Sequence, residues 1–361
     1  MDRSTRKLDH IRHALETTDQ PFNSFDEVSF VPNSLPNIGY HDVSLATDLG
    51  SFRLASPIII NAMTGGAEAT TEINRKLAII AREKHLAMAV GSQMAALRDP
   101  GVADSYRIVR KEHPNGIVFA NVGAEATVEQ AQAAVDMLDA DGLQIHLNVM
   151  QELLMPEGDR DFRGYIENIQ AMKESLDVPV MVKEVGFGMA KETIEKLNHI
   201  GISIIDVGGV GGTNFAKVEN RRSQKPLAMY ENWGLTTVES LLEAESFSQS
   251  KSQANVAIMA TGGVRHGLDV LKALVLGASA TGIAGEMLRL VQTSSLEDCL
   301  TAVDEWHHEL KVGMTALGVT RIADCPRIPV FVCGKAAYQA RLRGIDLEIL
   351  AQRVFDRATD S

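Results

Sequence analysis

The sequence predicts an α/β protein built on a TIM, or (β/α)8, barrel with helical appendages at its N- and C-terminal ends. About eight short apolar runs alternate with amphipathic stretches, a pattern typical of β/α units and a parallel sheet. These runs fall within residues 56–310, and roughly 250 residues is the usual size of such a barrel. A doubly wound sheet is the alternative, because the glycine-rich segment 208–212 follows one of the strands. That segment comes at the sixth unit, however, and no helix clearly begins inside it.

The chain is expected to form a single domain, 1–361, in three parts. Residues 1–55 make an N-terminal extension with a helix, 56–310 the barrel and 311–361 a C-terminal helical tail. The expected helices include 72–84, 128–138, 191–199 and 268–276, and many of the helices end in glycine before the next strand. The expected strands, in chain order, are 58–61, 87–90, 117–121, 143–146, 180–183, 204–207, 257–260 and 280–283.

Composition narrows the class of protein. The chain is 45% hydrophobic and 23% charged, as ordinary globular proteins are, and its net charge of −12 argues against a nucleic-acid surface spread over the whole molecule. No apolar run approaches the roughly 20 residues that span a bilayer, and the polar start of the chain lacks the apolar core of a signal peptide. We therefore expect a cytoplasmic protein. The three cysteines show no C-x-x-C pair and are expected to be reduced and mostly buried: Cys299, Cys325 and Cys333.

Almost every expected strand runs into a small or polar cluster, and in a barrel these clusters converge on one rim. The richest cluster, His146 to Glu152, holds an imidazole, two amides and a carboxylate in seven residues. His146 and Asn148 are two apart and so project to the same side of a strand. By itself the cluster suggests an acid–base pair of His146 and Glu152. The alternative is that His146 is a hydrogen-bonded structural residue.

Two further clusters indicate a phosphate. Gly262-Gly263-Val264-Arg265 and Ala284-Gly285 follow the seventh and eighth strands, where glycine amides and a helix N-terminus commonly hold an anion. Tight β/α turns without a ligand are the alternative. Lys183, at the end of the fifth strand, either pairs with a carboxylate such as Glu152 or stabilises negative charge on a bound ring such as a reduced flavin.

Several motifs together resemble, in the same order along the chain, those of the type 2 isopentenyl-diphosphate isomerase family. They are Arg6-Lys7-Leu8-Asp9-His10, Asn61-Ala62-Met63-Thr64-Gly65-Gly66, Gly91-Ser92-Gln93, His146-Leu147-Asn148-Val149-Met150-Gln151-Glu152, Gly211-Gly212-Thr213-Asn214-Phe215 and Gly262-Gly263-Val264-Arg265-His266-Gly267-Leu268-Asp269. The resemblance implies an FMN-containing barrel that interconverts isopentenyl diphosphate and dimethylallyl diphosphate in isoprenoid biosynthesis. It also implies a need for Mg2+ and for a reductant such as NADPH, and a homo-oligomer, either a tetramer or an octamer.

The resemblance carries residue roles with it. Gln151, His146 and Lys183 would be catalytic, and Glu152 would bind Mg2+. The substrate site would comprise Arg6, Lys7, His10, Ser92, Gln93, Met94, Arg98, His146, Asn148 and Gln151. FMN would be contacted by Ala62, Met63, Thr64, Ser92, Asn121, Lys183, Gly208 and Thr213, and its phosphate held by Gly263, Val264, Arg265, Ala284 and Gly285. Two positions depart from the family: Met94 stands where some relatives have arginine, so that Arg98 is a replacement contact, and Gly208 stands where serine is frequent.

The proposed chemistry needs a well-placed proton donor, because an unactivated alkene is a poor base. Reduced FMN is the expected acid and base of a 1,3-proton shift, with Lys183 favouring its anionic form. The rival functions are an FMN-dependent oxidoreductase that consumes reductant at each turnover and a protein that merely binds flavin or phosphate. The segment 214–236 is too long for a routine β/α turn and is expected either to close over the barrel mouth or to form a disordered surface loop.

Overall fold

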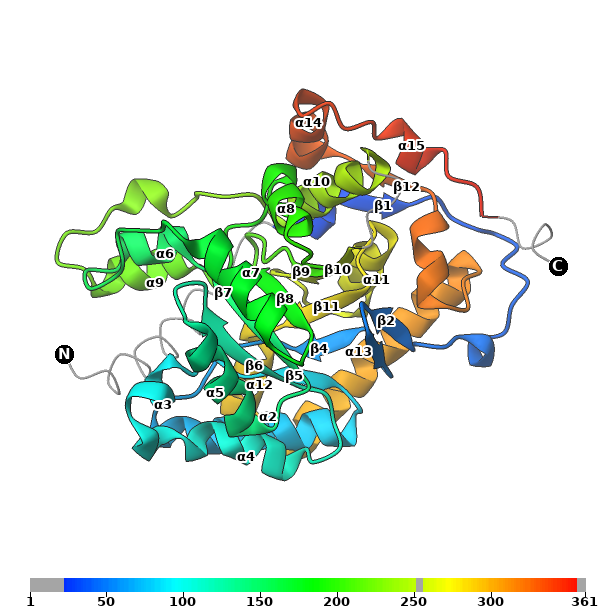
Figure 1. Ribbon diagram of the computed structural model, residues 1–361. Coiled ribbons are helices and arrows are strands. Elements are labelled where there is room, and N and C mark those ends of the chain that lie inside the picture. Colours follow the sequence, from blue (N-terminus) through cyan, green and yellow to red (C-terminus); the bar gives the residue numbers. More distant parts are fainter. Residues whose placement is uncertain (1–22, 251–255, 356–361) are drawn as a thin grey trace.

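A computed structural model describes residues 23–250 and 256–355, and it shows a closed parallel barrel (Figure 1). Ile58 to Ile60 pair with 281–283, so the last barrel strand closes on the first. This closure confirms the (β/α)8 class and overturns the doubly wound alternative, since an open sheet has two unpaired edges. The barrel strands are β4 (Ile58–Ile60), β5 (Ala87–Ala89), β6 (Val118–Gly123), β7 (Gly142–Leu147), β8 (Val180–Glu184), β9 (Ile204–Asp206), β10 (Ala257–Thr261) and β11 (Ala280–Ile283).

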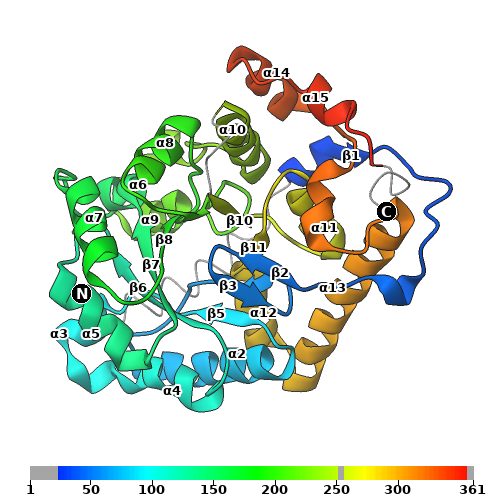
Figure 2. The same ribbon diagram turned by 45° about the vertical axis from the view of Figure 1, so that its right-hand side comes forward.

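Helices surround the barrel in both views (Figures 1 and 2), and several begin and end where the sequence predicts. The side chains of Thr127 and Gln130 form a capping box at the start of α5, which stops the helix from fraying at its expected first turn. The helices are α2 (Thr71–Glu83), α3 (Met94–Arg98), α4 (Asp104–Glu112), α5 (Val128–Leu138), α6 (Val149–Leu154), α7 (Tyr165–Ser175), α8 (Lys191–His199), α9 (Phe215–Arg222), α10 (Thr237–Ser250), α11 (Gly267–Val275), α12 (Gly285–Thr293), α13 (Leu296–Leu317), α14 (Gly334–Leu342) and α15 (Glu348–Ala351).

The barrel interior is apolar at one end and polar at the other. Ile59, Phe119 and Met259 belong to a small buried cluster inside the barrel, whereas Ile58 and Ile60, which point to the other side of β4, pack in the large outer core. The hairpin of β2 (Thr47–Leu49) and β3 (Phe52–Leu54) adds to the inner cluster and covers the N-terminal end of the barrel (Figure 2). The apolar plug leaves the C-terminal end of the strands for polar side chains.

A segment from the N-terminal part and one from the C-terminal part of the described chain pair on the outside of the barrel. Strand β1 (Val28–Phe30) pairs antiparallel with β12 (Val330–Val332), so the expected helical tail also contains a strand. Helix α13 runs to Leu317 and crosses the expected barrel boundary at 310, because its apolar residues continue to pack on the core. The motif from Arg6 to His10 lies outside the described residues. In the part of the chain that the structure describes, no helix is both long and apolar enough to cross a membrane.

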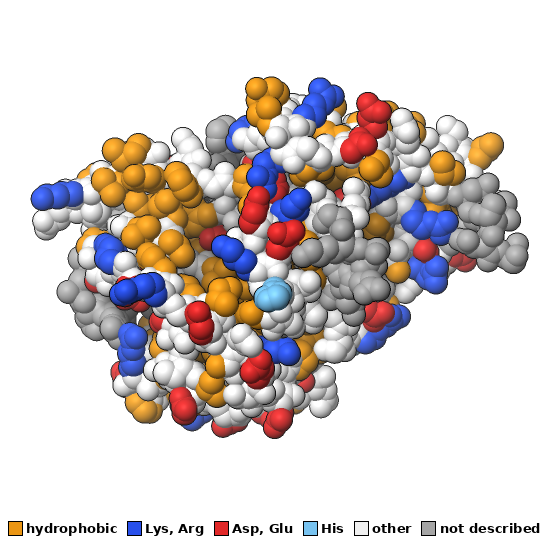
Figure 3. Space-filling model, turned by 45° about the horizontal axis from the view of Figure 1, so that its top comes forward, with side chains coloured by type: hydrophobic (Ala, Val, Ile, Leu, Met, Phe, Trp, Pro, Cys, Tyr) orange, Lys and Arg blue, Asp and Glu red, His pale blue; other side chains and the backbone are white. Residues whose placement is uncertain are grey.

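The segment 214–236 is ordered rather than a disordered loop. It contains α9, whose first turn is capped by the Asn214 side chain, and the 3-10 helix Ala228–Tyr230. Helix α9 packs against α6 at the edge of the molecule (Figure 1). Apolar side chains gather on this side of the surface (Figure 3), and the exposed ones include Leu153, Met229 and Trp233. A short helix rich in Arg, Lys and Glu carries too weak an apolar period to be recognised from sequence.

The pair His307-His308 on α13 forms no metal site with Glu309. His307 contacts the Ser56 hydroxyl, His308 contacts the Tyr40 hydroxyl, and the Glu309 carboxylate accepts a hydrogen bond from the Gly267 amide. Two of the three cysteines, Cys299 and Cys325, are buried, and Cys333 is exposed.

Candidate active site

A cavity of about 1230 Å³ opens at the C-terminal ends of the barrel strands. Small-molecule sites usually have volumes of roughly 300–1,000 Å³, so this one has room for two ligands side by side. Most of the predicted site residues within the described chain line it: Ala62, Met63, Thr64, Ser92, Met94, Arg98, Asn121, His146, Asn148, Gln151, Glu152, Lys183, Gly208, Thr213, Gly263, Val264, Arg265, Ala284 and Gly285. Arg6, Lys7 and His10 lie outside the described residues.

Gln93 is the exception, because its side chain is not at the cavity. Its amide nitrogen donates to the Ala134 carbonyl in α5, and its amide oxygen accepts from the backbone N–H of Asn121. Both distances are 2.9 Å and the side chain is fully buried. Gln93 therefore joins β6 to α5, and the structure does not place it where it would touch a substrate.

Glycine loops form one wall of the cavity. Gly262 has φ +115°, and a Cβ there would lie 2.1 Å from the Gly209 carbonyl oxygen, so the loops after β9 and β10 approach too closely for any side chain. Helix α12 begins at Gly285, and its N-cap, Ala284, has no side chain to cap the first-turn amides. Since these residues line the cavity, the exposed amides and the positive end of the helix dipole suit a phosphate there.

Gly208 differs from the family's frequent serine for a local reason. Its φ is +46°, and a Cβ on it would lie 2.0 Å from the Glu184 carbonyl oxygen. A side chain at this position would collide with the end of β8, so glycine is required by the backbone as it stands.

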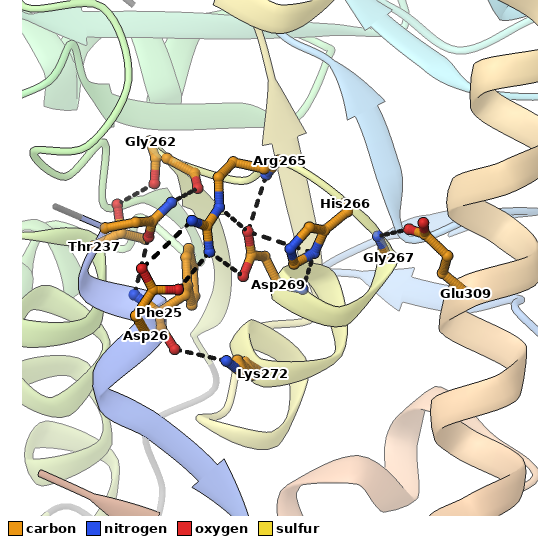
Figure 4. Close-up of polar contacts among 12 residues, drawn as sticks. Phe25, Asp26, Thr237, Gly262, Arg265, His266, Gly267, Asp269, Lys272 and Glu309 are labelled. Atoms are coloured by element: carbon orange, nitrogen blue, oxygen red, sulfur yellow. Dashed lines mark hydrogen bonds and ion pairs between the residues drawn. The ribbon is translucent and has the colours of Figure 1, made fainter. Parts of the chain in front are cut away.

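The predicted phosphate ligand Arg265 has its guanidinium group bound by two carboxylates (Figure 4). Its Nε lies 2.8 Å from Asp269 Oδ2 and its Nη2 lies 2.7 Å from Asp26 Oδ1, and its backbone amide also donates to Asp269. Asn23 adds a hydrogen bond of 2.6 Å to the Gly263 carbonyl. These contacts fasten the 23–30 segment to the loop 262–265, so the structural role of Arg265 is to hold that loop in place.

Lys183 and Glu184 occupy neighbouring positions at the end of β8 and face different surroundings. Lys183 is buried at the cavity wall, and its Nζ donates to the Glu184 carbonyl at 2.7 Å. Glu184 turns away from the cavity lining and accepts from the amides of Gly186 and Phe187. Burial raises the pKa of Glu184 to about 7, against the effect of these hydrogen bonds and of Lys183. The described residues show no ion pair between Lys183 and Glu152, so that pairing is not the reason for the lysine.

Gln151 is held by a residue that the sequence reasoning did not place in the site. Its Nε2 donates to Glu219 Oε1 at 3.0 Å, and the other oxygen of Glu219 pairs with Arg222 at 2.5 Å. Arg222 also pairs with Glu157 at 2.8 Å and lines the cavity. Glu219 comes from α9 and Gln151 from α6, so only the packing of these helices reveals the contact.

The metal candidate Glu152 lies near two other carboxylates. It accepts from the Asn148 side chain at 2.8 Å and from the Asp159 amide at 2.9 Å. Glu125 also lines the cavity, and its pKa is raised by burial and further by the charges of Glu152 and Asp159. The described residues nevertheless contain no group of three or more His, Cys, Asp or Glu side chains arranged to hold a metal. A divalent cation at Glu152 would therefore need most of its oxygen ligands from a bound diphosphate and water, as Mg2+ commonly does.

This chain is similar in sequence and in fold to proteins that are already known. Residues 111–328 match the FMN-dependent dehydrogenase family. The chain is 48% identical to the isopentenyl-diphosphate delta-isomerase of Geobacillus sp. strain WCH70 and 50% identical to that of Bacillus mycoides strain KBAB4, in each case over 98% of this chain and 100% of the relative.

Two solved structures share the fold at low identity. A flavocytochrome b2 variant with pyruvate bound superposes with a TM-score of 0.68 at 17% identity, covering 97% of this chain and 85% of that one. A putative lactate oxidase of Pediococcus acidilactici gives a TM-score of 0.65 at 15% identity, covering 90% and 87%.

Proposed function

This chain belongs to the isopentenyl-diphosphate delta-isomerase family, and we propose that it interconverts isopentenyl diphosphate and dimethylallyl diphosphate. The observation that carries this proposal is that two walls of one cavity present different chemical groups. Glycine amides and the start of α12 suit a phosphate on one side, and the imidazole, amides and carboxylate of 146–152 lie on another. A cofactor with one phosphate and a substrate with two would together need such a cavity.

The residues present fit FMN. The phosphate would be held by Gly263, Ala284 and Gly285, where the backbone is open and the helix dipole is favourable. The buried cation of Lys183 would stabilise negative charge on the ring, and the ring would also contact Ala62, Met63, Thr64, Ser92, Asn121, Gly208 and Thr213. In its reduced form, which NADPH would maintain, FMN supplies the acid and base of the 1,3-proton shift.

The protein's side chains would bind and orient the substrate. His146, Asn148 and Gln151 present hydrogen-bonding groups to the cavity, and Glu219 fixes the amide of Gln151. Glu152 would offer an oxygen to Mg2+ on the diphosphate, and Arg98 would contribute positive charge next to Met94. Arg6, Lys7 and His10 are further proposed contacts. On the same family grounds we propose a homo-oligomer, a tetramer or octamer, and a cytoplasmic location.

An FMN-dependent oxidoreductase is the second candidate, because the match over 111–328 is to dehydrogenases of that kind. Anaerobic incubation with excess isopentenyl diphosphate, FMN, Mg2+ and a small measured amount of NADPH separates the two. An isomerase forms many molecules of dimethylallyl diphosphate per NADPH. One product per NADPH identifies the oxidoreductase, and binding of FMN without any product contradicts both.

A further inference from the structure

A chain of buried amides crosses the inside of the barrel from β9 to the cavity. The side chain of Asn61 donates to Asp206 Oδ2 at 2.7 Å, and Gln144 Nε2 donates to Asn61 Oδ1 at 3.0 Å. Asn121 Nδ2 then donates to Gln144 Oε1 at 3.2 Å, and Asn121 Oδ1 lies 2.9 Å from His146 Nδ1. Asp206 and Gln144 are fully buried, and Asp206 does not line the cavity.

The direction of this chain is fixed at its far end. An ionised carboxylate only accepts hydrogen bonds, and Asp206 also accepts from the Thr261 hydroxyl at 2.8 Å and from the Gly208 amide at 3.1 Å. The oxygen of Asn61 is fixed independently, because it accepts from the backbone N–H of Ala62 at 2.9 Å. The nitrogen of Asn61 must therefore face Asp206, and it also reaches the Thr261 hydroxyl at 2.8 Å.

The orientations of the other side chains in the chain follow from that of Asn61. Since Asn61 presents its oxygen to Gln144, Gln144 must present its nitrogen there and its oxygen to Asn121. Asn121 then presents its nitrogen to Gln144 and its oxygen to His146. The ring nitrogen Nδ1 of His146 has an acceptor opposite it and must carry a hydrogen.

The charge of Asp206 and the Ala62 amide together give the chain its direction. Burial raises the pKa of this carboxyl, and Lys183, its partner in the register of β8 and β9, opposes the rise together with the three donors. A neutral carboxamide in its place would offer either an oxygen or a nitrogen to Asn61, so that the Ala62 amide alone would hold the orientation of Asn61 and of the amides that follow it.

We propose that Asp206 is a positioning residue that holds His146 with a hydrogen on Nδ1, which makes Nε2 the nitrogen that exchanges a proton at the cavity. The hydrogen bonds alone carry this assignment of the tautomer. Its use in binding a diphosphate, where an added proton on Nε2 would be stabilised by the anion, rests on the proposed function.

The test measures the tautomer directly. The full-length, FMN-loaded protein is labelled with 15N histidine and studied without substrate, at a pH where imidazole is neutral, by long-range 1H–15N correlation. The variant His146→Gln identifies the signal of His146. We expect a hydrogen on Nδ1 and a bare Nε2, and the opposite tautomer in the wild-type protein would overturn the proposal.

Two variants test the role of Asp206 and of the chain. Asp206→Asn is expected to give His146 a mixture of tautomers, whereas Asp269→Asn, the same change at an equally buried carboxylate outside the chain, should leave it unchanged. If Asp206→Asn does not fold, Gln144→Leu interrupts the chain and should give the same mixture. A pure wild-type tautomer in either interrupting variant would contradict the proposal. Because no substrate is present, this result is independent of whether the isomerase activity is found.

Discussion

Among individual residues, Lys183 connects the fold most directly to the proposed chemistry. Its ammonium group is buried at the cavity wall, where we propose that it faces the ring of FMN. We expect Lys183→Met to lower isomerase turnover roughly 10²–10³-fold, the usual effect of removing one group that stabilises developing charge. FMN content, measured from flavin absorbance, should remain near the wild-type level. Wild-type turnover in this variant would exclude a catalytic role for the cation.

In the part of the cavity wall that holds Gln151, the loss of Glu219 should lower the free energy of unfolding the most. Its side chain is 0% exposed and that of its partner Arg222 is 7% exposed, so Glu219→Ala leaves a buried cation with weakened pairing. We expect a loss of about 3–5 kcal/mol in the free energy of unfolding, measured with urea.

The matched control is Glu72→Ala, which removes a pair of the same residue types and spacing. Glu72 and Arg75 have side-chain exposures of 66% and 37%, and exposed pairs contribute about 0–1 kcal/mol. Similar losses of unfolding free energy in the two variants would show that burial does not determine how much the Glu219–Arg222 pair stabilises the protein.

The position of a side chain at the cavity was predictable where the residue lies at a strand end. His146, Lys183 and Thr213 line the cavity because each lies at or just after the C-terminal end of a parallel strand. Gln93 departs from this rule, because it is adjacent in sequence to Ser92, which lines the cavity, yet its side chain reaches α5. The same limit explains why Glu219 was not placed beside Gln151, which is 68 positions away in the sequence.

Among the secondary-structure elements, the end of β8 makes the free energy of unfolding depend on pH. Burial raises the pKa of Glu184 to about 7, above its ordinary value of 4.5, so the folded protein binds more protons than the unfolded chain between these pH values. This group therefore lowers the free energy of unfolding as pH rises from about 4.5 to 7, by about 3 kcal/mol in all. Glu184→Gln should remove this decline, and urea unfolding at several pH values would reveal it.

The difference between the wild-type and Glu184→Gln curves isolates this group from all others that titrate. Glu68→Gln, at an exposed position, controls for a surface substitution. Parallel curves for the wild type and Glu184→Gln would show that Glu184 keeps an ordinary carboxyl pKa in the folded protein.

The segment with α9 supports a prediction about closure. Tyr230 and Trp233 are exposed, and the same segment reaches the cavity through Arg222 and Leu227. If it closes over bound ligands, chymotrypsin should cut after Tyr230 and Trp233 more slowly once reduced FMN and isopentenyl diphosphate are added. Equal cleavage rates with and without ligands would mean that the segment does not act as a lid.

Element boundaries were predictable where local signals agree. Helix α5 has a capping box at its start and a left-handed residue, Asp139, after its end, so both limits are local properties. The 3-10 helix at 228–230 is only three residues long, and α9 has few apolar residues. Helix α9 packs against α6 and against the 3-10 helix, and hydrogen bonds from Asn214 and to Asn220 hold the segment. Such stabilisation comes from tertiary neighbours and leaves no periodicity in the sequence.

In the whole molecule, the 23–30 segment is bound to the barrel through Arg265, through the hydrogen bond from Asn23 to Gly263 and through that from Lys272 to Phe25. The Asp269 side chain is 0% exposed and that of Asp26 is 57% exposed, so the two carboxylates respond differently to the loss of the arginine. Arg265→Met should cost about 1.5–3 kcal/mol, because a buried carboxylate loses its charged donor. Asp26→Ala should cost about 1 kcal/mol or less. Urea unfolding of the two variants measures both losses of unfolding free energy. Equal losses would show that Asp269 is not the more important partner of Arg265.

The sequence by itself determined the (β/α)8 class, the order of its strands and most of the residues that face the cavity. Those properties depend on local patterns, because an apolar strand that ends in polar residues has only one way to fit a closed parallel barrel. Which distant side chains come together depends on the tertiary structure: Arg265 with Asp26, Gln151 with Glu219, and Asp206 with His146 through three amides. These pairs join residues far apart in the chain, and their geometry is set by barrel closure and helix packing rather than by any local pattern of residues.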